Sequence, residues 1–404
     1  MAVQIIGAGA TAFGRHPSAD LRTLSEEAAR AAVQDAALSF ADVQLVVFGN
    51  AVDGVLHGQE MIRGEVALRH TGLAGVPIVN VENACASSSS AFHVASLAVR
   101  AGEVDVALVI GTEKLTHPQK ARSFAAVATA TDLVAEPDLR HSVAATLLGA
   151  ESNGRSPLVH SPLMERYADK ARWYMARTGT TIEDVARVSV KNRWHGSLNP
   201  RAQFRVPVTA DEVLTSRMVA DPLRLLMCAP VGDGAAALIV ASDDYARLTG
   251  RAGVRVAASV VTSMGSVADA PGPAARAARR AYEQSGIGPL DVDVAEVHDA
   301  CAPAELWIYE ELGFCPPGEG AKLLHDGVTG LEGRLPVNPS GGLLSKGHPL
   351  GATGCGQLVE LTEQLRGRAG ARQVPGARVG LAHNCGGMID GEEAVGVVTI
   401  LSSE

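Results

Sequence analysis

The sequence predicts an α/β fold made of two similar halves, and three observations support this. Apolar runs typical of buried strands alternate with segments of helical periodicity along the chain. The same order of elements occurs twice, at an interval of about 250 residues, which is too long for a solenoid repeat. A stretch of different character separates the two occurrences. We therefore expect sheets with right-handed crossovers and helices on both faces, with an insertion between the halves.

The first half begins with the apolar run VQIIGAGA at 3–10, which is typical of a buried strand. The segment 21–38 has helical spacing, and Ser25, followed by two glutamates, is its expected N-cap. Further strands are expected at 42–50, 76–84 and 104–113, with a second helix at 87–103.

The second half repeats this order. Its expected elements are strands at 254–263, 291–300 and 377–387 and helices at 273–286 and 348–370. The helix at 348–370 corresponds to the helix at 87–103, so the residues that precede these two helices occupy equivalent places.

The chain therefore divides into three parts. Residues 1–115 with 230–250 form the first half, and 251–404 form the second. Residues 116–229 form an inserted subdomain of helices and loops, which contains most of a basic stretch at 160–224. That stretch suits an anionic ligand, or it is a solvated surface with surplus lysine and arginine.

Composition narrows the class of protein. The net charge of −9 argues against general nucleic-acid binding. No apolar run reaches the roughly 18 residues that span a bilayer, and no basic leader precedes a cleavage site, so we expect a cytoplasmic protein. The spacing of the cysteines fits neither a zinc site nor a disulfide framework, which predicts free thiols and no metal. They lie at positions 85, 228, 301, 315, 355 and 385.

Cys85 is the first candidate for chemistry. It follows the predicted strand 76–84 and precedes the helix that begins near Ser87. The positive end of a helix dipole favours thiolate, so we expect a lowered pKa for this thiol. The side chains of 87–90, all serine, are small enough to admit a ligand. The alternative is a buried structural cysteine.

His348 is the second candidate. It lies in NPSGGLLSKGHPLGATG (338–354), where glycines and prolines surround it and a helix follows. A histidine held in such a turn suits a base or an oxyanion donor. The alternative is a turn histidine with a satisfied hydrogen bond. The many glycines predict close approach of the backbone to another group.

Two further segments end predicted strands in the second half. In AHNCGGMIDG (382–391), Cys385 is followed by glycines that can present a backbone N–H beside a thiol. In VHDAC (297–301), His298 and Cys301 follow a strand whose carboxyl end is a common place for ligands. The alternatives are an ordinary strand exit with a buried cysteine, and a His298–Asp299 pair that caps the next helix.

These motifs together resemble the thiolases, and within them the sterol-carrier-protein X type. The resemblance extends through nearly the whole chain and is most specific in NPSGG…KGHPLGATG, with a moderate match around NACASSSSAFHVA. It implies a thiolase fold, with two βαβαβαββ-type halves in a layered αβαβα core. It also implies a homodimer or a dimer of dimers, and in several relatives a small zinc-ribbon/OB-fold partner protein.

The resemblance assigns roles residue by residue. Cys85 matches the nucleophile that becomes acylated, and His348 the histidine that activates it and lines an oxyanion hole. Cys385 and Gly387 match the Cys-x-Gly motif, which supplies an acid/base thiol and a glycine at the oxyanion site. His298 matches the histidine that helps to bind a thioester oxygen.

One departure concerns the acid/base thiol. The sterol-carrier branch has His-Asp-Cys-Phe, whereas this chain has HDAC, with Ala300 at the cysteine position and Cys301 one residue later. A shift by one residue turns a side chain in another direction, so Cys385 is preferred and Cys301 remains the alternative.

The implied activity is that of an acyltransferase with coenzyme A as cosubstrate. A 3-oxoacyl-CoA would acylate Cys85, and free coenzyme A would then take the acyl group; the reverse is a Claisen condensation. The resemblance places this in lipid or aromatic acid degradation and assigns coenzyme A phosphates to basic residues within 160–205. The alternatives are retro-aldol cleavage of a 3-hydroxyacyl-CoA, a biosynthetic acyltransferase on a small acceptor, and a non-catalytic lipid- or CoA-binding protein.

Overall fold

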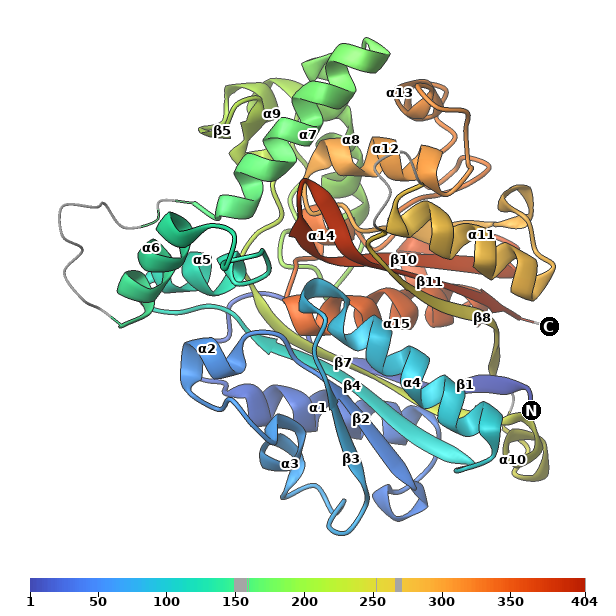
Figure 1. The fold of residues 1–404 in the computed structure, drawn as a ribbon. Coiled ribbons are helices and arrows are strands. Elements are labelled where there is room, and N and C mark those ends of the chain that lie inside the picture. Colours follow the sequence, from blue (N-terminus) through green and yellow to red (C-terminus); the bar gives the residue numbers. More distant parts are fainter. Residues whose placement is uncertain (149–157, 159, 252, 266–270, 404) are drawn as a thin grey trace.

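The computed structural model describes residues 1–148, 158, 160–251, 253–265 and 271–403 (Figure 1). Within these residues, nine strands form one mixed sheet in the order β3-β2-β4-β7-β1-β8-β11-β10-β9. The predicted α/β class with two similar halves is confirmed, since β3-β2-β4-β7-β1 comes from the first half and the other strands from the second. No described helix is long and apolar enough to cross a membrane.

The first half contains the expected strands and helices. Strands β2 and β4 pair in parallel, as do β2 and β3, whereas β7 runs antiparallel to both β4 and β1. Its elements are β1 (Val3–Ala10), α1 (Leu21–Asp35), β2 (Leu45–Gly49), α2 (Asp53–His57), α3 (Arg63–Leu68), β3 (Ile78–Val81), α4 (Ser87–Ala101), β4 (Val106–Lys114), β7 (Asp233–Ser242) and α10 (Asp243–Leu248).

One helix start differs from the prediction. Asp20, rather than Ser25, caps α1, since its side chain accepts a hydrogen bond from the N–H of Thr23. Ser25 is buried one turn inside the helix and donates to the carbonyl of Leu21. Aspartate is as good an N-cap as serine, and the earlier start allows Leu21 and Leu24 to pack in the core.

The second half repeats the order with one strand reduced. Where the first half has β3, the second has only an isolated parallel bridge between Val337 and Ala295. Of the strand predicted at 291–300, only the part that forms β9 is a strand. The strand predicted at 377–387 is β10, which extends to Ile389 and forms a hairpin with β11. The elements are β8 (Val254–Ser263), α11 (Pro273–Ser285), β9 (Val294–Glu296), α12 (Ala302–Glu311), α13 (Gly320–His325), α14 (Gly342–Ser345), α15 (Thr353–Leu365), β10 (Val379–Ile389) and β11 (Glu392–Ser402).

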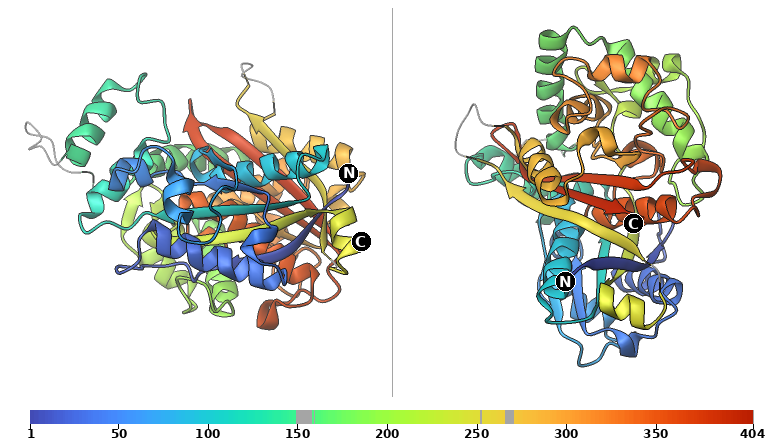
Figure 2. Two further views of the ribbon diagram at one scale, coloured as in Figure 1. Left: turned by 90° about the horizontal axis from the view of Figure 1, so that it is seen from below. Right: turned by 90° about the vertical axis from the view of Figure 1, so that its right-hand side faces the viewer.

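The two half-sheets meet only at β1 and β8, where Gln4 pairs with Arg255 and Ile5 with Val254. Helices α4 and α15 lie between the half-sheets and share one apolar cluster with strands of both (Figure 2). Helix α1 covers the outer face of the first half-sheet, and α11 and α12 cover that of the second. The result is the five-layered arrangement that the resemblance implied.

The segment between β4 and β7 holds five helices and a short hairpin among its described residues. The segment is inserted in the sequence of the first half, but its helices α7 and α8 pack in one core cluster with α12 of the second half. The segment therefore borders both halves at their shared end (Figure 1). Its elements are α5 (Lys120–Ala128), α6 (Pro137–Leu148), α7 (Pro162–Thr178), α8 (Ile182–Ser197), α9 (Ala210–Thr215), β5 (Met218–Ala220) and β6 (Leu223–Arg224).

Candidate active site

Cys85 lies in a short 3₁₀ turn, Ala84–Ala86, between β3 and α4. Ala84 has a φ of +48°, a left-handed conformation that costs a residue with a Cβ roughly 1 kcal/mol. Hydrogen bonds hold the turn: the N–H of Asn83 donates to Ser87 Oγ (3.0 Å), and Asn83 Nδ2 donates to Ser90 Oγ (2.9 Å). The cysteine therefore sits on a strained turn that its neighbours fix in place.

The serines at 87–90 do not admit a ligand, because all four are buried and none borders the main cavity. They allow α15 to approach α4 instead. Ser88 Oγ accepts a hydrogen bond from the N–H of Cys355 (3.0 Å), and a Cβ at Gly354 would lie 2.0 Å from Ser89 Oγ. Small residues on both helices thus bring the two equivalent helix starts together.

The expectation of a lowered pKa for Cys85 is wrong. Burial, and then the nearby carboxylate of Glu113, raise the pKa of the thiol to about 12. The backbone N–H groups of Cys85 and Gly387 act on the sulfur in the opposite direction but do not outweigh burial. Cys85 is a thiol in the free protein, and its reaction as a nucleophile requires a base.

His348 is the nearby candidate for that base, since one ligand atom of its ring lies within 4.8 Å of the Cys85 sulfur. Thr353 Oγ1 donates to the carbonyl of Pro349 (3.0 Å), so it serves as acceptor in its 2.8 Å contact with His348 Nδ1. Nδ1 therefore carries the proton and Nε2 is free to accept one. Burial, followed by the neighbouring His298 and Lys346, holds the pKa of His348 well below its usual value, so the ring is neutral.

His298 completes a cluster with these two residues. Its ring meets that of His348 edge to face, and one ligand atom from each of Cys85, His298 and His348 lies within 4.8 Å of the others. Burial and the neighbouring His383 lower the pKa of His298 to about 3. Its Nδ1 is buried without a hydrogen-bond partner among the described residues. The cluster thus presents one sulfur and two neutral imidazoles to a common point.

Asp299 does not cap the helix that follows it. Cys301 occupies the N-cap position of α12 and makes no capping hydrogen bond through its side chain. The Asp299 carboxylate instead accepts from the N–H of Leu343 (2.7 Å) and from Asn192 Nδ2 (2.8 Å). It therefore connects the strand end at 297–301 to the loop that precedes His348.

Cys385 lies inside β10 rather than at its end. The next residue, Gly386, faces the turn of Cys85, and a Cβ there would lie 2.1 Å from the carbonyl oxygen of Asn83. Cys385 is 3% exposed, and burial, then Glu393 and Cys85, raise the pKa of its thiol well above the usual value. The two thiols are therefore close enough to influence each other.

Cys301 is fully buried and lies opposite Cys228 in an isolated antiparallel bridge. Burial and then Cys228 raise the pKa of Cys301, and Cys85 is not among the groups that act on it most. Of the two candidate acid/base thiols, Cys385 has the stronger electrostatic link to Cys85.

A cavity of about 590 Å³ opens at this site. Cys85 and His348 border it, whereas His298, Cys301, Cys385 and Gly387 do not. Much of the wall is apolar and comes from the inserted segment and the residues near it, including Phe124, Val127, Leu163, Met164, Leu225 and Leu226. Tyr167 and Cys228 also border the cavity, and the sequence motifs pointed to neither.

The basic stretch contributes less to this cavity than its charge suggested. Lys170, Lys191 and Arg201 pair with acidic side chains. Within 160–205, only His160 and Arg193 of the basic and histidine residues border the cavity. The remaining cations at its wall lie outside that range and are Arg15, Lys120 and Arg217.

Glu113 is a buried residue of the site that the motifs did not indicate. Its carboxylate accepts from Asn50 Nδ2 (2.8 Å), from the N–H of Ala51 (3.0 Å) and from the N–H of Gly351 (2.9 Å). Burial raises its pKa to about 7. Glu113 thus connects the end of β2 to the turn that follows His348. Its position near the end of the predicted strand at 104–113 is the feature of the sequence that could have indicated it.

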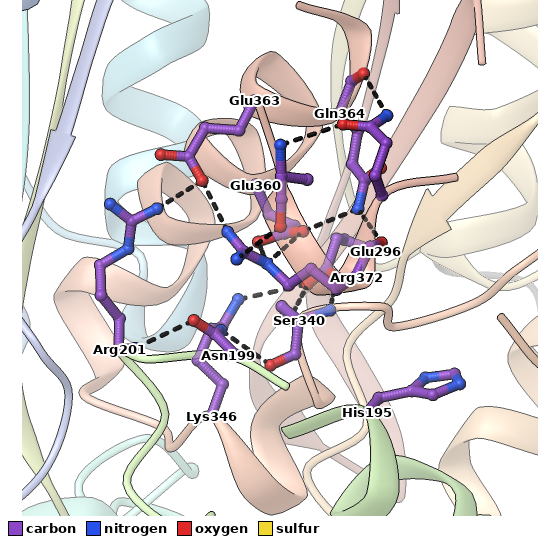
Figure 3. Close-up of polar contacts among 12 residues, drawn as sticks. His195, Asn199, Arg201, Glu296, Ser340, Lys346, Glu360, Glu363, Gln364 and Arg372 are labelled. Atoms are coloured by element: carbon purple, nitrogen blue, oxygen red, sulfur yellow. Dashed lines mark hydrogen bonds and ion pairs between the residues drawn. The ribbon is translucent and has the colours of Figure 1, made fainter. Parts of the chain in front are cut away.

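A buried polar network supports the loop of His348 from the other side (Figure 3). Glu296 accepts from Ser340 Oγ (2.7 Å) and pairs with Lys346 (3.2 Å), two residues before His348. Further contacts extend the network, with Arg372 joining Glu360 and Glu363, and Arg201 reaching Glu363. Paired charges therefore fix the loop that carries the histidine.

Comparison with known proteins places both halves in one family. A model of the thiolase N-terminal domain matches residues 3–244, and a model described as thiolase C-terminal domain-like matches 252–402. Acetyl-CoA acetyltransferase of Methanothermobacter thermautotrophicus is 40% identical, covering 95% of this chain and 96% of that protein. Sterol carrier protein 2 of Bos taurus is 38% identical, covering 95% and 70%. Benzoylsuccinyl-CoA thiolase subunit BbsB of Thauera aromatica is also 38% identical, covering 95% and 94%.

Solved structures show the same fold. A structure described as Ltp2-ChsH2(DUF35) aldolase matches with a TM-score of 0.77 and 25% identity, covering 99% of this chain and 97% of that one. Human mitochondrial 3-ketoacyl-CoA thiolase in complex with CoA matches with a TM-score of 0.72, covering 100% and 98%. At 16% identity, this second likeness concerns the fold alone.

Proposed function

The chain belongs to the thiolase family and is an acyltransferase, and we propose that it cleaves a 3-oxoacyl-CoA by thiolysis, or forms one by Claisen condensation, through an acyl group on Cys85. The observation that carries the proposal is the cluster of Cys85, His348 and His298, with ligand atoms within 4.8 Å of one another. Two of its members, Cys85 and His348, border an apolar cavity.

In the first step, His348 Nε2 takes the proton of Cys85, and the sulfur attacks the 3-oxo carbon. The raised pKa of the thiol supports the need for this base, and the neutral, Nδ1-protonated ring supports its role. The N–H groups of Cys85 and Gly387, which act on the sulfur, serve as donors to the oxygen that develops negative charge. His298 assists at the thioester oxygen of the leaving half.

The second step breaks the bond between the α-carbon and the 3-carbon. We assign Cys385 as the acid that protonates the α-carbon. Cys385 lies in β10, and Cys85 is among the groups that raise the pKa of its thiol. Cys301 remains the alternative, and its link to Cys228 rather than Cys85 counts against it.

Coenzyme A would enter past the cations at the cavity wall. Arg193 stacks on Phe204 with 4.5 Å between its guanidinium carbon and the ring centroid, and Lys120 lies 5.2 Å from the centroid of Phe124. These two residues, with Arg15 and Arg217, are suited to phosphate groups. The apolar wall beyond them suits an acyl group larger than acetyl.

The assembly is also a proposal. Strand β3 forms one edge of the sheet. Val79 on β3 is 41% exposed, and on α4 Val94 is 36% and Leu97 is 48% exposed. Such an edge beside an apolar surface suits a second copy of the chain, which supports a homodimer. A relative named as a subunit and a neighbour solved with a DUF35 protein support an accessory partner of the small zinc-ribbon/OB-fold kind.

The neighbour described as an aldolase favours a second candidate, retro-aldol cleavage of a 3-hydroxyacyl-CoA. That reaction needs no acylated cysteine and no free coenzyme A. Incubation of 3-hydroxyacyl-CoAs without coenzyme A separates the two, because release of an aldehyde or ketone that persists in Cys85→Ala would support the aldolase.

A screen of coenzyme A-dependent thiolysis tests the main proposal. Short, long, branched and aromatic 3-oxoacyl-CoAs are supplied to the wild-type protein and to Cys85→Ala and Cys85→Ser. We expect cleavage of at least one acyl class by the wild type and loss of at least about 10³-fold in both variants. Full cleavage by either variant would refute the acyl-Cys85 route.

A further inference from the structure

Cys228 and Cys301 face each other across an isolated antiparallel bridge. The N–H of Ala229 donates to the carbonyl of Ala300 (3.0 Å), so the neighbouring residues are the hydrogen-bonded pair and the two cysteines are the non-hydrogen-bonded pair. In such a pair the Cα atoms are about 4.5 Å apart, and both side chains leave the same face of the ladder. No other two cysteines of the described residues are partners in a strand pairing or bridge.

This arrangement suits a disulfide between the two residues, because Cα atoms that a disulfide joins are usually about 4.4–6.8 Å apart. Both side chains are free thiols. Cys228 Sγ donates a hydrogen bond to the carbonyl of Arg224 (3.4 Å), which is weak for a thiol, and the side chain of Cys301 makes no capping bond to α12. Neither sulfur is therefore held in a strong contact that closure of a disulfide would break.

The two thiols differ in their access to a reagent. Cys228 borders the cavity of about 590 Å³, whereas Cys301 does not border it and is fully buried. A small reagent in the cavity therefore reaches Cys228 first. Cys301 is then placed to react with the sulfur opposite it.

Burial acts differently on the thiols and on the disulfide. It raises the pKa of Cys228 to about 12 and the pKa of Cys301 well above its usual value. Because thiolates carry out thiol–disulfide exchange, oxidation of the pair is slow near neutral pH. A disulfide carries no charge, so burial imposes no such cost on the oxidised form.

We propose that Cys228 and Cys301 form a redox modification site, at which a low-molecular-weight disulfide oxidises the pair to an intramolecular disulfide. Cys228 first loses its proton to solvent and attacks one sulfur of the reagent, whose S–S bond breaks and whose leaving thiolate takes up a proton. Cys301 then loses its proton, attacks the Cys228 sulfur of this mixed disulfide and releases the second thiol. Two cysteines are oxidised and one reagent disulfide is reduced to two thiols. The new bond joins the end of the inserted segment to the start of α12 at the cavity wall.

The test uses the full-length protein, with glutathione disulfide as the reagent at about pH 8.5, where thiolates are more abundant. Remaining thiols are blocked with N-ethylmaleimide during unfolding, and tryptic peptides are analysed without reduction. Cys228 lies in the peptide 225–247, whereas Cys301 and Cys315 share the peptide 281–322. Cys315→Ser is therefore the matched control, since it removes the other thiol of that peptide and does not border the cavity.

We expect the wild type and Cys315→Ser to yield the two peptides joined by a disulfide, which dithiothreitol cleaves. Cys301→Ser should stop at a mixed disulfide between Cys228 and glutathione. Cys228→Ser should leave Cys301 a thiol, with modification at least about tenfold slower than closure in the wild type. The oxidised wild type should unfold at a urea concentration at least as high as the reduced protein, because the bond fits the native fold.

Four results would overturn the inference. They are a disulfide from Cys301 to a cysteine other than Cys228, glutathione on Cys228 beside a Cys301 that stays a thiol in the wild type, and a lower urea midpoint after oxidation. The fourth is a wild type in which both residues stay thiols under conditions that oxidise them after unfolding in urea. The test uses no acyl-CoA, so its outcome is independent of the proposed function.

Discussion

The rings of His298 and His348 meet edge to face, with their centroids 5.1 Å apart and an angle of 82° between their planes. Both rings are buried, and burial lowers the pKa of both. Two neutral imidazoles therefore stand beside Cys85 without repelling each other. In the proposed mechanism, His348 accepts the proton of the thiol and His298 assists at the thioester oxygen.

This pairing predicts the pH dependence of catalysis. A base works in its deprotonated form, so a pKa held well below 6.5 extends activity to lower pH. Glu113, whose pKa burial raises to about 7, also titrates in this range, so the measurement uses Glu113→Gln beside the wild type. We expect kcat/KM for thiolysis by Glu113→Gln, which reports the free enzyme, to stay within about twofold between pH 8 and pH 6. A loss centred near pH 6.5, in protein that remains folded by circular dichroism, would contradict the neutral pair.

The same cluster predicts inhibition by zinc. One sulfur and two imidazole nitrogens within 4.8 Å match the ligands that Zn²⁺ prefers. We expect micromolar Zn²⁺ to inhibit reversibly, with recovery on addition of EDTA. Titration calorimetry should show one site, which His298→Asn weakens by about tenfold or more. Unchanged zinc affinity in that variant would place the ion elsewhere. The sequence-based expectation that catalysis requires no metal remains a prediction.

The Glu296–Lys346 pair predicts a large stability effect. Lys346→Met leaves the carboxylate of Glu296 buried without its cation, which costs about 3–5 kcal/mol in the free energy of unfolding. The double variant Lys346→Met/Glu296→Gln should regain much of this. Urea denaturation measures both, and a loss below about 1 kcal/mol in the single variant would show that the pair does not hold the loop.

His195 predicts a specific proton linkage. Burial, and then Lys191, lower its pKa to about 3, so between pH 6.5 and 3 the unfolded chain binds one proton more than the folded protein. Its contribution to stability is thus full above pH 6.5 and falls by about 1.4 kcal/mol per pH unit as the pH drops.

His195→Gln should remove this dependence. Relative to the variant, the unfolding free energy of the wild type should decline by about 1.4 kcal/mol per unit between pH 6.5 and pH 5, with a constant difference above pH 7 as the internal control. Parallel curves in urea denaturation at pH 7.5, 6 and 5 would show that His195 is not buried in its neutral form.

Much of this fold follows from pattern, because strand and helix periods and the duplication are local properties of the sequence. The duplication also placed Cys85 and His348 at equivalent helix starts, which the structure brings together. Ser25 shows the limit: both it and Asp20 suit an N-cap, and packing of Leu21 decided between them.

The electrostatics of the site did not follow from pattern. A helix start predicted an acidic thiol at Cys85, but burial and the charge of the distant residue Glu113 raise its pKa and outweigh the backbone N–H groups of Cys85 and Gly387. Asp299 accepts a hydrogen bond from the N–H of Leu343 in α14 and does not cap the adjacent α12. This contact between distant segments depends on the tertiary fold and not on the neighbouring sequence. Tyr167 enters the site from an inserted helix with no repeat to compare, so nothing in its local sequence marked it.

The most direct test of the account is intact-protein mass spectrometry after brief incubation with an acyl-CoA, followed by peptide mapping. The account predicts a mass increase equal to one acyl group, located on Cys85, absent in Cys85→Ala and discharged by free coenzyme A. An acyl group on another cysteine, or turnover of a 3-oxoacyl-CoA by Cys85→Ala at the wild-type rate, would contradict it.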